Sequence, residues 1–167
     1  MKKRFSQFVF LSVVNLFLWF LLIGSYTQQE LIAGLLVSTL GSWITVSRTS
    51  LFASVRLNLL APVSLLLYLL VFFKQLLIAN LDMARRVVSP GLPINPGVVT
   101  VKTGLTSRLG KLLLANSITL TPGTLSVDVT GDELVVHWID CPPDCNTDMA
   151  TRMIASDFEK HIIGFLQ

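Results

Sequence analysis

The distribution of apolar and polar positions divides the chain into a strongly hydrophobic first half and a mixed second half. Residues 5–24 form an apolar run that contains no ionisable side chain. A helix of about 20 residues, at about 1.5 Å per residue, crosses a bilayer core about 30 Å thick. We expect an uncleaved membrane span rather than a signal peptide, because the run exceeds a typical signal-peptide core and no small-x-small cleavage site follows it.

A second apolar run without charge covers residues 31–47 and predicts a second membrane helix. Within it, Gly34, Ser38 and Ser42 recur every four residues. Small residues let membrane helices approach closely, so we expect this side to pack on another helix. Lys and Arg precede the first run and follow the second, and none lies between them. Because Lys and Arg favour the cytoplasmic side, this pattern predicts a hairpin with both ends in the cytoplasm.

Residues 57–84 are apolar enough for a third span, but Arg85 and Arg86 follow directly. A third crossing would place these arginines outside, against the charge rule. On a helical projection the polar side chains form a seam along one side, which favours an interfacial or tilted helix with its basic side toward the head groups. A third span with Lys74 facing a protein partner is the alternative. The seam residues are Arg56, Ser64, Tyr68, Lys74, Gln75, Asp82, Arg85 and Arg86.

Lys74 and Asp82 are the charged residues within this third segment, so they are the candidates there for an ion route or a protein interface. The first two runs have no such group. Asn15 is the strongly polar side chain deep in the first run, and we expect it to bond to a neighbouring helix.

The second half of the chain begins after a segment rich in proline and glycine, residues 88–97. This segment predicts the boundary between membrane anchor helices (1–87) and a small cytoplasmic domain (98–167). Period-two alternation, turn residues and helical stripes then predict a β-α-β-β-α order, an α+β sandwich of a small sheet under two helices. The residues expected to be buried are Leu109, Leu112, Leu113 and Asn116 on the first helix, and Met149, Met153, Ile154, Phe158, Ile162 and Phe165 on the last.

The amino-acid composition indicates what the first half of the chain binds. Apolar residues make up 52% of the 167 residues and charged residues only 14%, where a soluble domain has about 25%. Residues 1–87 hold eight Lys and Arg against two Asp and Glu, whereas the remainder holds five against eight. Because the basic half is also the apolar half, its expected partner is anionic lipid at the cytoplasmic face rather than nucleic acid.

The polar residues of the second half do not form a recognisable reactive set. His137 and His161 lack converging partners in the sequence, and Cys141 and Cys145 do not have the CxxC spacing of redox or zinc sites. No phosphate-binding glycine loop is present. We therefore expect free thiols, no catalytic, cofactor or metal site, and a protein that is not an enzyme.

The stretch at residues 114–125, with residues 127–129 and 134–138 behind it, resembles the E subunit of the Mrp-type multisubunit Na⁺/H⁺ antiporters. Membrane-bound hydrogenases contain a similar subunit. The resemblance implies an accessory subunit of a complex whose ion paths run mainly through larger subunits, and it leaves a contribution to the sodium path open. The motif residues are Asn116, Ser117, Thr119, Thr121, Pro122, Gly123 and Thr124. Their short polar side chains suit backbone capping, and docking on a partner loop is the alternative.

Together these observations predict an accessory, non-catalytic, multi-pass subunit of a cation/proton antiporter in the cell membrane, with a cytoplasmic C-terminal domain. Its expected partners are the other membrane subunits of that complex. Two alternatives are the equivalent subunit of a membrane-bound hydrogenase or related complex, and a free-standing membrane-tethered binding domain with an exposed pocket.

Overall fold

The computed structural model describes residues 2–24, 26–48 and 60–166 of the chain. Its contacts divide into two compact units, Met1–Ala53 and Ser54–Gln167, which we describe separately. The third apolar helix belongs to the second unit, together with the sheet. The predicted division into an anchor and a domain at residues 88–97 stays a prediction.

The first unit is a hairpin of two packed helices, α1 (Lys2–Ile23) and α2 (Gln28–Arg48). Gly24 follows α1 with φ +64°, a left-handed conformation in which glycine commonly ends a helix. At the start of α2, the Thr27 hydroxyl accepts a hydrogen bond from the Glu30 amide. Such a side chain satisfies one of the free N–H groups that every helix start leaves. The two predicted apolar helices are confirmed.

The third apolar helix, α3, covers Ala61–Val88. Pro62 lies in its first turn, where a proline sacrifices no helical hydrogen bond. The helix ends before Ser89, since Pro90 disfavours helical backbone at the residue before it. It therefore runs four residues beyond the predicted 57–84, and the predicted part before Leu60 lies outside the described residues. All three helices are long and apolar enough to cross a membrane.

The second unit carries an antiparallel sheet of three strands, β1 (Gly97–Lys102), β2 (Thr124–Thr130) and β3 (Glu133–Trp138), in the order β1-β3-β2. A register shift after Ser126 marks a bulge in β2. The tight turn between β2 and β3 contains Gly131 at φ +62°, as a short hairpin turn requires.

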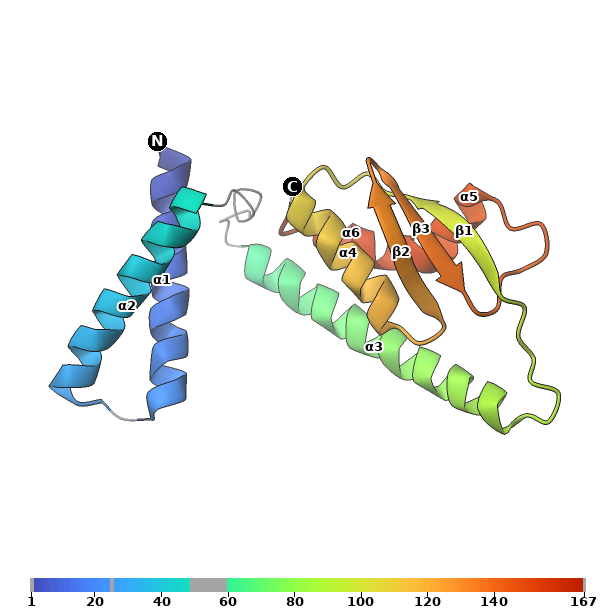
Figure 1. Ribbon diagram of the computed structural model, residues 1–167, viewed down its shortest axis with the longest axis horizontal. Helices are drawn as coiled ribbons and strands as arrows, with labels where there is room; N and C mark the ends of the chain where they lie inside the picture. Colours follow the sequence, from blue (N-terminus) through green and yellow to red (C-terminus); the bar gives the residue numbers. More distant parts are fainter. Residues whose placement is uncertain (1, 25, 49–59, 167) are drawn as a thin grey trace. The chain divides into compact units, whose positions relative to one another are not determined.

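Helices cover one face of this sheet (Figure 1). Helix α4 (Arg108–Leu120) packs on β2, and α5 (Thr147–Ala150) packs on β1. A π-helical turn, Thr151–Ala155, joins α5 to α6 (Ser156–Ile162), and α3 packs outside α6. The predicted β-α-β-β-α order is confirmed, with α3 as a further layer. The largest fully buried core side chains are Val101, Leu114, Ile118, Leu134, Val136, Ile162 and Leu166.

The buried faces of the domain helices match the predicted ones in part, since Ile154, Phe158, Ile162 and Phe165 are buried as expected. On α4, Leu112 is 52% exposed, whereas Leu114 is fully buried. On the last helical segment the π-helical turn inserts an extra residue, so that Ala150 and Ala155, five positions apart, are both fully buried. Met149 and Met153, by contrast, are exposed. A sequence projection at constant helical pitch cannot show such a turn.

The proline-rich segment between α3 and β1 is bonded to the domain. The Asn95 amide donates to the Ile139 carbonyl, and the Cys141 amide donates back to the Asn95 carbonyl at 2.8 Å. The Arg86 guanidinium also donates to the Pro93 carbonyl at 2.6 Å. These bonds bind both the segment and the end of α3 to the loop after β3.

Candidate functional site

The predicted packing residues of α2 lie at its interface with α1. Gly34, Ser38 and Ser42 are the buried residues of α2. A side chain on Gly34 would place its Cβ 2.5 Å from the Trp19 indole, so only glycine fits there. The Trp19 Nε1 in turn donates to the Glu30 carbonyl at 3.2 Å, which fixes the ring.

One polar bond between side chains crosses this described interface. The Asn15 Nδ2 donates to the Ser42 Oγ at 3.0 Å. The Ser38 hydroxyl instead donates to the Gly34 carbonyl within its own helix. The Asn15, Ser38 and Ser42 side chains thus bond to protein, which suits helix association more than ion coordination. The Ser12 hydroxyl of α1 is buried and forms no hydrogen bond within the described part of the chain.

The family-motif residues of the second unit surround the end of α4 and the turn that follows it. The hydroxyl groups of Thr121 and Thr124 donate to the carbonyls of Ser117 and Ile118, both at or below 2.8 Å. These carbonyls belong to the last turn of α4, where the helix itself offers no donors. The Thr119 hydroxyl accepts from the Ser126 amide and so joins the helix to β2.

Two further motif residues have distinct surroundings. Gly123 has φ +95°, and a Cβ there would lie 3.1 Å from Ile139, so the turn requires glycine. Asn116 is exposed on α4. Its side chain is therefore open to a partner.

Ser117 connects the motif to α3. The Ser117 hydroxyl donates to the Leu113 carbonyl at 2.7 Å, and its oxygen lies 2.7 Å from the Tyr68 hydroxyl. Because Ser117 has a single proton, Tyr68 is the donor in this bond. Tyr68 is 5% exposed and its ring packs 5.7 Å from that of Phe165. The motif thus provides part of the surface on which α3 rests.

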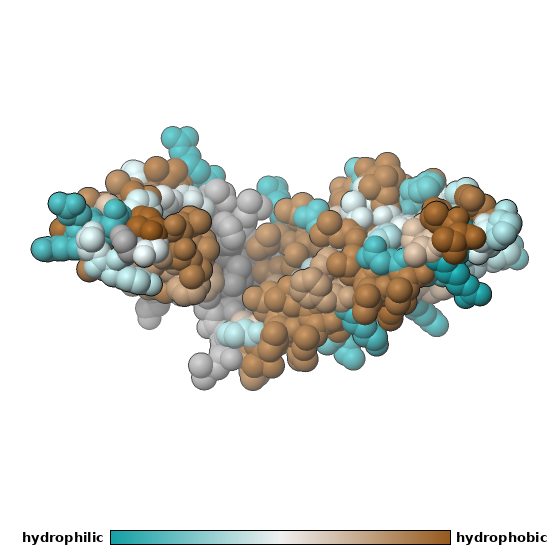
Figure 2. All heavy atoms as spheres, turned by 90° about the horizontal axis from the view of Figure 1, so that it is seen from below, coloured by the Kyte–Doolittle hydropathy of each residue, from teal (hydrophilic) through white to brown (hydrophobic). Residues whose placement is uncertain are grey.

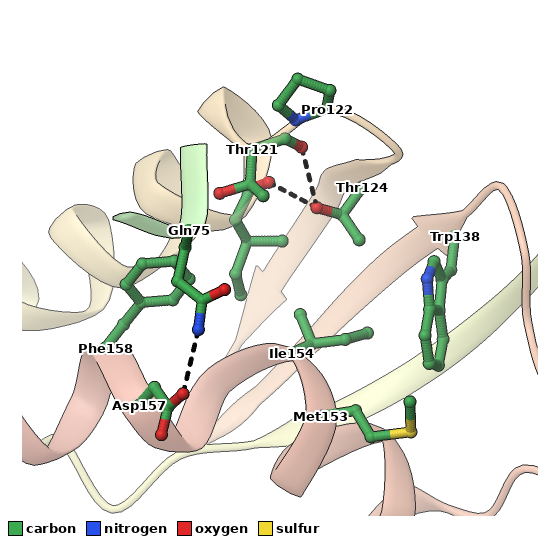
Figure 3. A pocket seen from close by; sticks show the side chains of 10 residues that line it. Gln75, Thr121, Pro122, Thr124, Trp138, Met153, Ile154, Asp157 and Phe158 are labelled. Carbon is green, nitrogen blue, oxygen red and sulfur yellow. Dashed lines mark hydrogen bonds between the residues drawn. The ribbon is translucent and has the colours of Figure 1, made fainter. Parts of the chain in front are cut away.

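A cavity of about 160 Å³ lies between this motif and α3 (Figure 3). Gln75 and Asp157 stand on one side of it, joined by a hydrogen bond of 3.0 Å from the Gln75 Nε2. Its other walls carry motif hydroxyls and apolar side chains. The lining residues are Gln75, Ile118, Thr121, Pro122, Thr124, Trp138, Met153, Ile154, Asp157 and Phe158.

This cavity has little chemistry of its own. The Thr121 and Thr124 hydroxyl protons are directed at backbone carbonyls, and the Asp157 carboxylate accepts from Gln75. Such an arrangement holds elements together, since these polar groups already have partners. The motif could be found by resemblance, but Gln75 and Asp157 could not, because 82 positions separate them.

The two charged candidates on α3 have different surroundings. Asp82 accepts from the Arg86 Nε at 2.6 Å, and Arg86 also contacts Asp140 at 2.7 Å. Asp82 is therefore one member of a clamp between α3 and the loop after β3. Lys74 is exposed on a side of α3 away from this clamp. The clamp shares no residue with the cavity.

Most of the polar seam of α3 faces the domain, and the expected position of its basic side chains at the head groups stays a prediction. Tyr68 and Gln75 bond to α4 and α6, and Ser64 lies against Gly164. Lys74, Asp82 and Arg85 are the exposed members among the described seam residues. Arg56 lies outside the described residues. The seam is polar because it packs on a polar domain surface.

The thiols are the remaining reactive groups. Cys141 and Cys145 are free and partly buried. Burial first, and then the charge and the hydrogen bond of Cys141, raise the pKa of the Cys145 thiol. Within the described part of the chain, no cluster of three His, Cys, Asp or Glu side chains could hold a metal ion.

These features define a class: a membrane protein with three apolar helices and a small α+β domain fixed to the third. A family model described as "Na+/H+ ion antiporter subunit" matches residues 12–164. The chain is 33% identical over 157 residues to the E subunit of the Na(+)/H(+) antiporter of Alkalihalophilus pseudofirmus, covering 93% of this chain and 95% of that one. It is 31% identical over 156 residues to the E subunit of the Bacillus subtilis antiporter, covering 92% and 94%.

A solved structure contains a chain that is similar to this one over nearly its whole length. It is that of the membrane-bound sulfane sulfur reductase, an archaeal respiratory membrane complex. One of its chains superposes on 95% of this chain and 98% of its own length, with a TM-score of 0.82 and 37% identity. The chain described here therefore belongs to the family of Na⁺/H⁺ antiporter E subunits. The expected resemblance and the expected membrane location are confirmed.

Proposed function

We propose that this chain is an accessory, non-catalytic subunit of a multisubunit Na⁺/H⁺ antiporter complex in the cell membrane. Family membership supports the antiporter complex. The accessory role rests on one observation: residues 5–24 and 31–47 contain no ionisable side chain, and the Asn15–Ser42 pair between them is bonded within the protein. Passage of an ion through the bilayer requires ionisable or coordinating groups at mid-depth, so these groups must come from neighbouring subunits.

The proposal includes a topology. The hairpin crosses the membrane twice with both ends in the cytoplasm, because basic residues flank it and the segment between its helices has none. The C-terminal domain then lies in the cytoplasm. Cys141 and Cys145 are partly exposed on this domain, so they report its side directly. A membrane-impermeant maleimide should label them in inverted vesicles and not in intact cells. Labelling in intact cells would contradict this topology.

The complex is tested by purification and transport. Affinity purification of the tagged chain in mild detergent should recover several multispanning proteins. Inverted vesicles that contain the whole complex should exchange Na⁺ for protons, whereas vesicles from cells without this chain should lose most of that activity. Isolation of the chain as a stable lone monomer, with transport unaffected by its deletion, would overturn the proposal.

A second candidate is the equivalent subunit of a membrane-bound respiratory complex. The likeness to a chain of the archaeal sulfane sulfur reductase favours it. The same purification separates the two candidates, because only a respiratory complex would contain subunits with redox cofactors. Optical or paramagnetic signals of iron–sulfur clusters in the purified complex would favour this second candidate over the first.

A further inference from the structure

The side of α3 that faces away from the domain is a long apolar surface, which we call the α3 outer face. Its residues recur at intervals of three and four positions, so they lie on one side of the helix. Each of them is more than half exposed. They are Val63, Leu66, Leu70, Phe73, Leu77 and Leu81, with exposed fractions between 53% and 64%. Figure 2, which views the molecule from below, shows mostly apolar residues where α3 lies. Soluble proteins rarely leave such a continuous apolar patch to water.

The opposite side of α3 is attached to the domain from one end to the other. Near its start, Ser64 lies so close to Gly164 that a Cβ on the glycine would meet the serine hydroxyl. At its middle, Gln75 bonds to Asp157, and near its end Arg86 pairs with Asp140. From Ser64 to Arg86 a helix extends about 33 Å. The domain therefore accompanies α3 along its length.

The attachment of the domain restricts the orientation that α3 can take in a membrane. If α3 stood upright across the bilayer, its middle would lie near the bilayer centre, and Asp157 would be beside it. A carboxylate at that depth is strongly disfavoured. The sheet of the domain also has open edges, whose free backbone groups could not be satisfied in hydrocarbon. An upright α3 is thus incompatible with the attached domain.

We propose that α3 lies flat in the membrane interface, with its outer face toward the acyl chains and the domain on the water side. This placement rests on the proposed function for the side of the membrane that it occupies. In this placement lipid covers the outer face, and the positive charge of the neighbouring basic side chains favours anionic head groups. Lys74 and Arg85 are exposed on the same edge of the outer face, where long basic side chains reach the head groups while apolar side chains lie deeper.

Spin labels along the outer face test this placement. In the whole purified complex, with Cys141 and Cys145 replaced by serine, single cysteines are introduced as Val63→Cys, Leu70→Cys, Leu77→Cys and Ala84→Cys. All four positions are exposed and seven residues apart, so they lie on nearly the same side of the helix. The labelled complex is placed in vesicles of phosphatidylcholine and phosphatidylglycerol. Collisions of each label with oxygen and with a water-soluble nickel complex then give its depth.

A flat helix predicts four similar, shallow depths, about 5–10 Å into the head-group and acyl boundary. An upright helix predicts shallow labels at positions 63 and 84, which are about 32 Å apart along the helix, and deep labels at 70 and 77. A partner subunit covering the face predicts labels that neither reagent reaches. Either of the last two results overturns the proposal.

Two controls calibrate the measured depths, and a second series of cysteines covers variants that fail to assemble into the complex. Leu36→Cys in the hairpin gives the depth of a label in the hydrocarbon core, and Thr130→Cys at the end of β2 gives the signal of a label in water. Leu66→Cys, Phe73→Cys and Leu81→Cys form a second series on the same face, for use where a first-series variant fails to purify with its partners. A complex that assembles and transports normally but shows an upright α3 would refute this placement without affecting the proposed function.

Discussion

Asn15 in the hairpin and Tyr68 in the second unit each join a helix to its neighbour through a buried serine. The Asn15–Ser42 bond measures 3.0 Å and the Tyr68–Ser117 bond 2.7 Å. Their surroundings differ, because Tyr68 lies in a core of aromatic and aliphatic side chains whereas the hairpin has only its single interface. In water the hydrophobic core supplies most of the stability. In lipid, close backbone approach and hydrogen bonds must replace that core.

The largest expected difference between the two regions comes from removing core volume in the second unit. Leu114→Ala empties space around a fully buried side chain on α4 and should lower the free energy of unfolding by about 2–5 kcal/mol. Leu112→Ala, on the same helix but 52% exposed, should cost less than about 0.5 kcal/mol. Thermal denaturation of the full chain in detergent, followed by near-ultraviolet circular dichroism, measures both. Equal losses would mean that α4 packs through another face.

In the hairpin, we expect added side-chain volume, rather than removed volume, to weaken the packing of α1 on α2. Gly34→Ala places a methyl group against Trp19, and overpacking of this kind costs about 1–3 kcal/mol. Gly41→Ala is the matched control, since the nearest atom to its new Cβ is 4.0 Å away. The readout is the disulfide yield between Asn15→Cys and Ser42→Cys in a chain lacking its native cysteines. We expect a lower yield for Gly34→Ala and an unchanged one for Gly41→Ala; the reverse order would place the helix contact elsewhere.

A smaller effect should follow from loss of the Tyr68 hydroxyl. Tyr68→Phe keeps the ring in the core and leaves Ser117 bonded to Leu113, so it should cost about 1 kcal/mol, one ordinary hydrogen bond. The chain has one other tyrosine, Tyr26, which is 75% exposed beside the hairpin. Tyr26→Phe should leave the melting temperature unchanged. Two identical shifts would argue against the bond between α3 and α4.

The smallest effect concerns the thiols, since both cysteines of the chain lie in the second unit. Because its pKa is raised, Cys145 carries less thiolate than an ordinary cysteine at a given pH, and its alkylation rate should reach half of its maximum at a higher pH than that of a free thiol, which does so at pH about 8.5. Cys141→Ala removes the charge and hydrogen bond that contribute to this shift, so the midpoint of the rate profile should fall. A midpoint that stays or rises would show that Cys141 has no influence on Cys145.

The sequence predicted the elements of both regions better than their packing. Helix and strand periods, Pro62, Gly24 and Gly131 mark local preferences, and local signals of this kind survive into the structure. The buried face of α4 was misplaced around Leu112, since its buried residues are Gly110, Leu114, Ala115, Ser117 and Ile118. Contact between distant segments, such as Gln75 with Asp157, depends on the complete fold.

The same limit applies to the candidate site. The motif was visible as a resemblance, and the close spacing of hydroxyl side chains suggested backbone capping. Its role as a support for α3 requires Tyr68, which lies 49 positions before Ser117. The polar seam of α3 was correctly located in the sequence, but a projection shows only that one side is polar and not whether water, head groups or protein lies against it.

We propose that the membrane part of this chain has no ion path of its own. The most direct test is to reconstitute the purified chain alone in sealed vesicles with a pH gradient and an entrapped pH dye, and to add Na⁺ outside. We expect the gradient to decay as slowly as in vesicles without protein, whereas vesicles containing the whole complex should discharge it. Sodium-dependent discharge by the chain alone would contradict the account.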